Sequence, residues 1–385
     1  MEVHLAYRYL VIGAGTVGPA IAWKILSEAD TELVTLADVD GDRAQKALCN
    51  LLRIAPNASS KCRSIMLDAR NEASVLKVFY AHDMVISALP AQYNPVLASH
   101  AISTGASFCD LGGVVRITKE MMQLDTRAEL AGVSIVPDCG LMPGMGMVLA
   151  RALMEEFDET DTVRIYVGGM PQRPVPPHNY LRVFNLEGLQ EICAPAETLE
   201  RGVLVTKDPF ADYERMYIPE LARFATPFNG HVEAFLTAGA SIAPETFAAQ
   251  NVKYFCEKTV RWPGFVKFVR HIPSGAFVET FASHVPSVSA ENPDFVFMRV
   301  EAYGILHGMS RQASMTCIDA FDVSTGFSAM ARTTGFATAL MAARIARGYV
   351  RKGAATPEWA LSLSGLRTHV EDLEDCFRIT KTVTA

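Results

Sequence analysis

Between residue 1 and about residue 137, the hydrophobic residues follow two spacing patterns that take turns along the chain. Short, nearly continuous apolar runs are each followed by a stretch with helical spacing of its apolar positions, such as residues 42–52. We predict strands at LVIG and LVTLAD, and then at residues 64–71, 84–90, 107–113 and 133–140. Strands that alternate with helices in this way predict a parallel sheet with helices on both faces.

The rhythm changes after residue 138. A helix is predicted at residues 145–156. The segments VEAFLTAGAS, KYFCEKTVRWPGFVKFVRHI and FVFMRVEAYGILHG alternate apolar and polar residues as strands do. Residues 327–347 have a helical pattern rich in alanine, so this helix can pack closely against a neighbour. Runs of strands with few helices predict a second, α+β domain with an open sheet.

The first apolar run ends in a glycine-rich turn, and a helical pattern follows it directly. Glycines at the first, third and sixth positions allow a tight turn, close approach of a pyrophosphate, and close packing of the helix on the strand. The N–H groups at the start of that helix favour a bound dianion. The second strand ends in an acid at the offset of about 20 residues that dinucleotide sites require. These features predict a Rossmann-type cofactor site at Gly13, Gly15, Thr16, Val17, Gly18 and Asp38.

The end of the second strand also predicts which dinucleotide binds. Asp38 can accept two hydrogen bonds from the adenosine ribose and would repel a 2′-phosphate. Asp40 adds a second negative charge, which Arg43 offsets only in part. We therefore expect NAD rather than NADP. Further cofactor contacts are predicted at Asp68, for which a helix cap or solvated acid is the alternative, and after the fourth strand at Ala88, Leu89 and Pro90.

These patterns predict an α/β fold with three segments. A Rossmann dinucleotide-binding domain is expected at residues 1–140, an inserted α+β mixed-sheet domain at 141–325, and a C-terminal helical segment at 326–385 that returns to the Rossmann domain. At 385 residues and 42.0 kDa the chain is too long for one ordinary core.

Composition limits the partners. The net charge of −7 and the lack of a basic cluster argue against nucleic acid, and no apolar run has the length of a membrane span. The eight cysteines form no C-x-x-C pair, and the histidines have no H-x-x-x-H spacing. We therefore expect no metal site, reduced thiols and a cytoplasmic protein.

Ligands of open α/β sheets bind outside the carboxyl ends of the strands. Asp110 follows the fifth strand and could hold a substrate amine, or it could cap its own DLGG turn. Asp138 follows the sixth strand and could bind substrate or cap the next helix. Tyr93 could face the nicotinamide or simply pack. Asp110 and Tyr93 are thus the catalytic candidates, and the substrate candidates at this edge are Leu111, Gly112, Asp138 and the pocket-wall residue Cys139.

A series of motifs runs from about residue 8 to residue 350: VIGAGTVG with LADVD, SALP, DLGG, PDCGLMPGM, YVGGMPQRPVPP, FNLEGL, TAGAS, KTVRWPG and MARTTG. Together they resemble the saccharopine dehydrogenase family and are most similar to its lysine 6-dehydrogenase branch. The resemblance implies a nucleotide domain interrupted by a mixed-sheet domain that supports dimerisation, with an amino-acid substrate in the cleft between them. Phe265 departs from the family pattern, in which a histidine is common at this position.

Arg261, in KTVRWPG, is the predicted ligand of the substrate carboxylate, because a planar guanidinium holds a carboxylate by two hydrogen bonds. A surface ion pair is the alternative. Hydroxyl and N–H groups that could complete this grip come from Thr237, Gly239 and Ser241. The histidines at 178, 231 and 271 are predicted to be structural.

The resulting hypothesis is an NAD-dependent oxidoreductase that acts on the amine carbon of an amino acid. The leading candidate for its reaction is oxidative deamination of L-lysine at the ε-amine. The alternative within the enzymes is a dehydrogenase or reductase of secondary amines such as saccharopine or carboxynorspermidine, whose extra carboxylates would require Arg173 and Arg182 beside Arg261. A non-catalytic nucleotide-binding protein is the alternative of another class, since fold does not fix function. The sequence leaves open the exact substrate, the physiological direction, the general base, and the oligomeric state beyond an expected homodimer or larger assembly.

Overall fold

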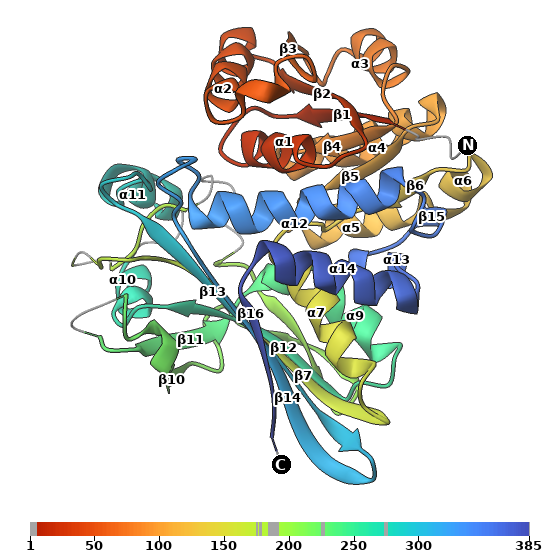
Figure 1. Cartoon of the computed structure of the whole chain (residues 1–385). Helices are drawn as coiled ribbons and strands as arrows, with labels where there is room; N and C mark the ends of the chain where they lie inside the picture. The colour runs from red at the N-terminus through yellow and green to blue at the C-terminus, as the bar shows by residue number, and fades with distance from the viewer. Residues whose placement is uncertain are drawn as a thin grey trace. The chain divides into compact units, whose positions relative to one another are not determined.

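Two separate sheets organise the chain (Figure 1). The structure is a computed structural model that describes residues 6–174, 176, 179–183, 192–224, 228–272 and 276–384. Its internal contacts divide the chain into unit 1, Met1–Val148 with Ala331–Cys376, and unit 2, Leu149–Met330 with Phe377–Ala385.

The sheet of unit 1 is parallel throughout, as the sequence predicted, and contains seven strands of the described chain. Its order is β15 (Gly353–Ala354), β6 (Ser134–Val136), β5 (Ser107–Asp110), β4 (Met84–Ser87), β1 (Tyr7–Ile12), β2 (Thr31–Asp38) and β3 (Cys62–Met66). The strand order reverses between β1 and β4. Ligands of doubly wound sheets bind at the carboxyl ends of the strands at such a switch point.

The helices of unit 1 begin where the sequence supplies a cap. Asp40 accepts a hydrogen bond from the N–H of Arg43 at the start of α2, and Asn71 accepts one from Ser74 at the start of α3. Apolar residues of the strands and of the helices that cover them form one core, with Leu10, Val85 and Phe108 fully buried. The helices are α1 (Gly18–Leu26), α2 (Gly41–Ile54), α3 (Glu72–Phe79), α4 (Asn94–Thr104), α5 (Val115–Met122), α6 (Asp125–Leu130), α13 (Pro357–Ala360), α14 (Leu363–Cys376) and most of α12 (Ala329–Ala346).

The sheet of unit 2 is mixed, and it has nine strands among the described residues. Its main path is β10 (Glu214–Tyr217), β11 (His231–Leu236), β12 (Tyr254–Arg261), β7 (Glu159–Pro171), β13 (Asp294–Leu306), β14 (Met309–Ala320) and β16 (Ile379–Thr384), while β8 (Ala196–Glu200) joins β12 to β9 (Val203–Lys207). Long aromatic side chains fill its cores, including Trp262, Phe295 and Phe297. The described residues of this unit include the helices α9 (Ala243–Ala248), α10 (Phe265–Val269), α11 (Phe277–His284) and most of α7 (Met145–Met154).

The structure corrects two sequence predictions. The segment after Arg261 does not continue as a strand: Gly264 takes a positive φ of 105° and starts the short helix α10. The C-terminal segment is not wholly helical and does not remain in unit 1. It contributes β15 to the first sheet, but β16 pairs with β14 in the second.

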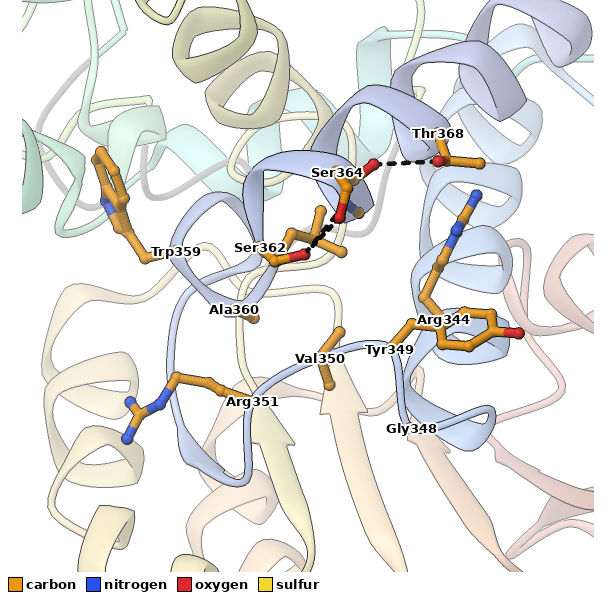
Figure 2. A pocket seen from close by; sticks show the side chains of 12 residues that line it. Arg344, Gly348, Tyr349, Val350, Arg351, Trp359, Ala360, Ser362, Ser364 and Thr368 are labelled. Carbon is orange, nitrogen blue, oxygen red and sulfur yellow. Dashed lines mark hydrogen bonds between the residues drawn. The ribbon is translucent and has the colours of Figure 1, made fainter.

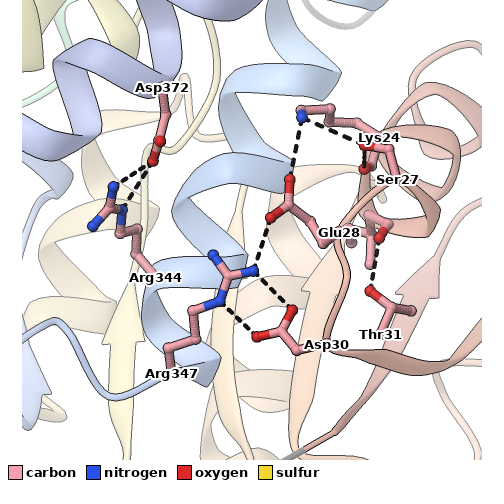
Figure 3. A network of polar contacts seen from close by, with 9 residues as sticks. Lys24, Ser27, Glu28, Asp30, Thr31, Arg344, Arg347 and Asp372 are labelled. Carbon is pink, nitrogen blue, oxygen red and sulfur yellow. Dashed lines mark hydrogen bonds and ion pairs between the residues drawn. The ribbon is translucent and has the colours of Figure 1, made fainter. Parts of the chain in front are cut away.

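A charged network ties the end of α12 to the turn before β2 (Figure 3). The guanidinium of Arg347 binds both oxygens of Asp30 at 2.7 Å and a carboxylate oxygen of Glu28 at 2.8 Å. Lys24 also donates to Glu28. The Arg347 hydrogen bond lowers the pKa of Asp30, so the folded state favours the ionised carboxylate.

Replacing Arg347 by Met is expected to lower the free energy of unfolding by about 2 kcal/mol, between the values for exposed and fully buried ion pairs. The pKa of Asp30 is lower in the folded state, so this stabilisation is present above the ordinary carboxyl pKa and is lost as the pH falls through the folded value. The stability difference between wild type and Arg347→Met should therefore shrink on acidification, which urea titrations at pH 7 and pH 3 measure.

Arg8→Met is the matched control. Arg8 pairs with Glu32 at 2.6 Å, but both side chains are nearly half exposed, so the loss of stability should be much smaller than for Arg347→Met. Equal losses in the two variants would contradict the importance of the Arg347 network.

Candidate functional site

The glycine-rich turn is built by contacts that leave no room for side chains. A Cβ on Gly18 would lie 1.8 Å from the carbonyl oxygen of Gly13, so α1 can start there only from a glycine. Gly13 has a φ of 106°, and a Cβ on it would lie 2.7 Å from the carbonyl oxygen of Ala88. The backbone of the turn is therefore in close contact with both the start of α1 and the end of β4.

The part of this turn that would meet a phosphate is open. Gly15 and Thr16 are exposed, and nothing lies within 4 Å of a Cβ built on Gly15. Within the described part of the chain, the N–H groups of Gly15, Thr16 and Val17 donate no hydrogen bond. Unpaired N–H groups at a helix N-terminus suit an anion, so this loop fits the pyrophosphate of a dinucleotide.

Asp38, at the end of β2, helps to shape the turn. Its Oδ2 accepts a hydrogen bond from the N–H of Ala14 at 2.8 Å, and its Oδ1 accepts one from Asp40 at 3.0 Å. The guanidinium nitrogens of Arg43 lie 3.7 Å from a carboxylate oxygen of Asp38 and 3.7 Å from one of Asp40. This single arginine therefore offsets more of the negative charge of the two acids than the sequence alone indicated.

The other predicted cofactor residues also lie at this edge of the sheet. The N–H of Ala88 donates to Ile12 at 2.8 Å, which places Ala88, Leu89 and Pro90 directly after β4 and beside the glycine turn. Asp68 is partly exposed, and both of its oxygens bind Arg70. The Arg70 hydrogen bond lowers the pKa of Asp68 to about 2. This local ion pair suits the alternative of a solvated acid, and the cofactor contact at Asp68 stays a prediction.

Asp110, at the end of β5, is the hub of a buried network. Its Oδ1 accepts hydrogen bonds from the N–H groups of Gly112 and Asp138, at 2.8 and 2.9 Å, and its Oδ2 accepts one from the amide of Asn94 at 2.8 Å. Burial, reinforced by the charge of Asp138, raises the pKa of Asp110 to about 7. These contacts favour the capping role that the sequence left open as the alternative to a contact with the substrate amine.

The loop after β5 (residues 111–113) and the loop after β6 (residues 138–139) are held together by hydrogen bonds around this network. Asp138 has a φ of 65°, and its Oδ1 accepts hydrogen bonds from the Thr118 hydroxyl at 3.0 Å and the Gly113 N–H at 3.3 Å. A Cβ on Gly112 would lie 2.0 Å from that same oxygen. Leu111 is half-buried beside it.

Two further candidates at this edge have packing roles. The thiol of Cys139 donates to the carbonyl of Val136, and burial raises its pKa well above the usual range, so the thiolate is disfavoured. A buried, protonated thiol of this kind is a poor nucleophile, and its place in a pocket wall stays a prediction. Tyr93 lies in a short 3₁₀ turn, Ala91–Tyr93, and packs against the core of unit 1.

In unit 2, Arg261 is buried, with 3% of its surface exposed, and is not the surface ion pair that was its alternative. Its Nη1 donates to the carbonyl of Val260 at 2.8 Å. Its guanidinium lies 4.9 Å from the ring centre of Tyr180 and 5.4 Å from that of Phe265. By hydrogen-bond geometry neither the Nε of Arg261 nor the hydroxyl of Tyr180 has a partner among the described residues, but the two groups do interact, since Arg261 lowers the pKa of Tyr180 against the larger rise that burial causes.

Thr237 and Gly239 directly follow β11 and lie beside Glu257, whose carboxylate already uses them. The Thr237 hydroxyl donates to Glu257 at 2.9 Å, and the Gly239 N–H is also bonded to Glu257. The structure therefore assigns these two donors to a side chain of the protein, where the sequence had assigned them to the substrate. Ser241 is buried at the end of the Ala238–Ala240 turn, with a φ of 50°.

Sequence reasoning missed three residues of these networks. Asn94 holds Asp110 from the first turn of α4, and no local pattern connects the two. Tyr180 contacts Arg261 from a segment far away in the sequence. Glu257 could have been found, because it and Arg261 are four residues apart on one strand and so face the same side of the sheet.

A multi-carboxylate substrate would require Arg173 and Arg182 as well as Arg261. Arg173 is exposed, and Arg182 binds the hydroxyl of Ser287 at 2.6 Å. Among the predicted histidines, His231 and His271 each bond to a nearby backbone carbonyl, and His178 lies outside the described residues. No cluster of metal-ligating side chains occurs in the described ranges. No helix in those ranges has the length and apolar character needed to cross a bilayer.

A hollow of about 620 Å³ in unit 1 lies away from the glycine turn (Figure 2). It is lined by the residues that precede β15 and by the start of α14, where the hydroxyl of Ser362 accepts from the N–H of Gly365. Both of its arginines are already paired, Arg344 with Asp372 and Arg351 with Asp125. Because β15 is parallel to β6, this hollow borders the amino ends of the strands, opposite the expected cofactor edge.

A parallel sheet with this glycine turn and an acid at the end of β2 defines a dinucleotide-binding oxidoreductase fold. Residues 9–136 match the family model described as the saccharopine dehydrogenase NADP binding domain, and residues 140–375 match that of the saccharopine dehydrogenase C-terminal domain. The chain therefore belongs to the saccharopine dehydrogenase family, which confirms the family resemblance found in the sequence, while the likeness to the lysine 6-dehydrogenase branch stays a prediction.

Individual relatives are distant. The chain is 23% identical over 267 residues to a Schizosaccharomyces pombe saccharopine dehydrogenase (NADP⁺, L-glutamate-forming), an alignment that covers 67% of this chain and 57% of that protein. It is 27% identical over 206 residues to the mitochondrial alpha-aminoadipic semialdehyde synthase of Mus musculus, covering 51% of this chain and 21% of that protein. The chain thus spans about half or less of the length of these relatives.

A solved structure shares the whole fold. The apo saccharopine dehydrogenase (L-Glu forming) of Saccharomyces cerevisiae superposes with a TM-score of 0.78 at 16% identity, covering 99% of this chain and 100% of that one. At this level of identity the likeness shows the fold.

Proposed function

We propose that this protein is an oxidoreductase that uses a nicotinamide dinucleotide to oxidise the amine carbon of an amino acid, with the ε-amine of L-lysine as the first substrate. The observation that carries the proposal is Arg261, a buried guanidinium whose Nε still has a hydrogen bond to give. A substrate carboxylate is the natural acceptor for that bond. The reaction class comes from the family, whose named relatives include saccharopine dehydrogenases.

The chemistry assigned to the protein is binding and placement. The dinucleotide supplies a nicotinamide ring that accepts a hydride. The substrate amine must be neutral, so that its nitrogen lone pair forms the C=N bond of a protonated imine as the C–H bond breaks. Water then adds to the protonated imine, and an aldehyde and an ammonium ion result. Gly15, Thr16 and Val17 would hold the pyrophosphate, while Asp110 keeps the loop after β5 in place.

The decisive experiment supplies NAD⁺ with L-lysine or with L-saccharopine and measures NADH, ammonia and released glutamate. We expect NADH and ammonia in equal amounts from lysine. NADH with glutamate from saccharopine alone would support the secondary-amine alternative, which the names of the relatives favour and the exposure of Arg173 disfavours. No turnover with any amine or imine would indicate a non-catalytic nucleotide-binding protein.

For the cofactor we propose NAD as the preferred dinucleotide, on the basis of the two acids at the end of β2. Asp38→Ala is expected to weaken NADH binding by roughly 1.5–3 kcal/mol, the range for hydrogen bonds to a charged group. It should also reduce the ratio of the affinity for NADH to the affinity for NADPH. Part of the loss will come from the turn itself, because Asp38 also accepts a hydrogen bond from Ala14. Fluorescence titration with both cofactors provides the measurement.

Arg43→Ala is the companion variant. It removes the cation beside Asp38 and Asp40 and should strengthen the preference for NADH, because a 2′-phosphate would lose a positive charge at this position. If the unmutated protein binds NADPH as tightly as NADH, Asp38 is not the group that distinguishes the two.

The role of Arg261 predicts a specific kinetic change. Arg261→Lys keeps the positive charge but loses the planar pair of donors, so it should raise KM for the amino acid at least tenfold with a smaller effect on kcat. Initial rates over a range of substrate concentrations separate the two parameters. An unchanged KM would show that the carboxylate is bound elsewhere.

A homodimer or larger assembly and a cytoplasmic location remain part of the proposal. They follow from the family resemblance and the composition, and sedimentation equilibrium of the purified chain measures the first.

A further inference from the structure

The hollow of unit 1 has a positively charged lining, although the chain as a whole is acidic (Figure 2). Arg344 and Arg351 line it, and no aspartate or glutamate is among its described lining residues. The whole chain, by contrast, has a net charge of −7. A positively charged hollow favours an anionic occupant over a neutral or cationic one.

Arg344 has hydrogen bonds left to give inside this hollow. Its side chain is only 9% exposed, and its Nε and Nη2 atoms both donate to the same oxygen of Asp372, Oδ2. Its Nη1 atom donates to no acceptor in the described part of the chain, and it is not closed off from solvent. A guanidinium has five N–H donors in a planar fork. The ion pair with Asp372 therefore leaves the hydrogens of Nη1 for an anion in the hollow.

The start of α14 presents a second set of donors to the same hollow. Ser362 precedes the helix, and its hydroxyl caps the N–H of Gly365 at 3.2 Å. The N–H groups of Leu363 and Ser364 donate no hydrogen bond to any described residue. The first turn of this helix contains no acid, so no side chain there neutralises the positive end of the helix dipole. Backbone N–H groups, a hydroxyl and a guanidinium are the donors that bind phosphate groups in proteins.

An exposed aromatic side chain adjoins this charged end of the hollow. Tyr349 has 57% of its surface exposed, and the Arg344 guanidinium lies 5.9 Å from its ring centre. Figure 2 shows the two side chains next to each other. An exposed aromatic face can stack on another planar ring. The hollow, at about 620 Å³, is also in the size range of sites for whole organic ligands, so a phosphate group alone would fill only a part of it.

We propose that this hollow binds a phosphate monoester that carries a planar ring and has about the size of a nucleoside monophosphate. The phosphate would accept hydrogen bonds from Nη1 of Arg344 and from the N–H groups at the start of α14, and the ring would lie on Tyr349. The site is separate from the cofactor site, because the hollow borders the amino ends of the strands and the glycine turn lies at their carboxyl ends. It does not depend on the reaction proposed above.

The experiment titrates AMP into the full-length protein saturated with NADH, so that the dinucleotide site is already filled. Isothermal titration should show one AMP site. Adenosine, which lacks the phosphate, and inorganic phosphate, which lacks the ring, should each bind roughly tenfold more weakly or worse. The fluorescence of bound NADH should not change during the titration. Displacement of NADH, no AMP binding, or an AMP affinity no higher than that of adenosine or of inorganic phosphate would overturn the proposal.

Ser364→Asp tests the anion site without weakening the helix. A carboxylate in the first turn of α14 is favourable to the helix dipole but would repel a phosphate. AMP affinity should therefore fall by roughly tenfold or more, while the thermal unfolding temperature should not fall. Arg367→Ala is the matched control, since it makes the same change in net charge at an exposed residue of α14 that does not line the hollow. It should leave AMP affinity within about twofold, and equal losses in the two variants would contradict the proposed site.

Two further variants test the guanidinium and the ring. Arg344→Lys keeps a positive charge beside Asp372 but has no planar fork, so AMP affinity should fall by roughly tenfold. Tyr349→Ala changes an exposed side chain, so the fold should be kept. It should reduce AMP affinity to about that of inorganic phosphate and leave the phosphate affinity within about twofold. An unchanged AMP affinity in the Tyr349→Ala variant would show that the ring does not lie there and would overturn the proposal.

Discussion

Gly18→Ala is expected to prevent unit 1 from folding normally, with a loss of about 3 kcal/mol or more in the free energy of unfolding. The added methyl group would lie 1.8 Å from the carbonyl oxygen of Gly13, and that oxygen belongs to backbone that cannot move without opening the turn. Gly13 is itself in close contact with Ala88, so any displacement of Gly13 would also displace the residues at the end of β4. Thermal unfolding followed by circular dichroism measures the effect.

Gly15→Ala, three residues away, separates folding from binding. A Cβ there meets nothing within 4 Å, so stability should stay within about 0.5 kcal/mol of wild type. The methyl group would nevertheless stand on the open surface that we assign to the pyrophosphate, and NADH affinity should fall at least tenfold. A stable Gly15→Ala protein that binds NADH normally would show that the pyrophosphate lies elsewhere.

Asp110→Ala is expected to cost about 4 kcal/mol of stability. It would leave three donors without their acceptor: the N–H groups of Gly112 and Asp138 and the amide of Asn94. Each unsatisfied buried donor costs about 1–3 kcal/mol. Asp110→Asn should be nearly as harmful, because an amide group would face either the Asn94 amide or the two backbone N–H groups. Urea titration gives the free energies.

The exchange Asn94→Asp with Asp110→Asn tests what the carboxylate is for. The double variant can restore every hydrogen bond, since the new acid at 94 accepts both from Ser87 and from the amide at 110. Recovery of both stability and turnover would make Asp110 a positioning residue. Recovery of stability without turnover would show that the charge is needed at position 110, as the sequence first suggested.

The nucleotide-binding half of the fold could be read from the sequence because its signals are local. Glycine spacing, an acid at the end of a strand and the alternation of strand and helix are all short-range patterns. In unit 2 the deciding contacts are long-range. Thr237 offers its hydroxyl to a side chain twenty residues away on the neighbouring strand, and nothing near Thr237 identifies the acceptor.

Two errors had signals that were overlooked. In FVKFV the apolar residues Phe265, Val266 and Val269 have helical spacing, and the glycine before them allows the turn that starts α10. The segment ITKTVT is rich in β-branched residues, as strands are. A sequence can indicate that β16 is a strand, but it cannot indicate which of two sheets accepts it.

The pairing of β16 with β14 bears on how the protein is made. Every other strand of the second sheet emerges from the ribosome earlier, and β14 then waits while α12, β15, α13 and α14 are synthesised. At usual translation rates this interval is on the order of several seconds. During it, one edge of a twelve-residue strand has unpaired N–H and C=O groups, which can pair with another nascent chain. Synthesis of this protein therefore includes a period of exposure that chaperones would have to cover, and slow codons after residue 320 would lengthen it.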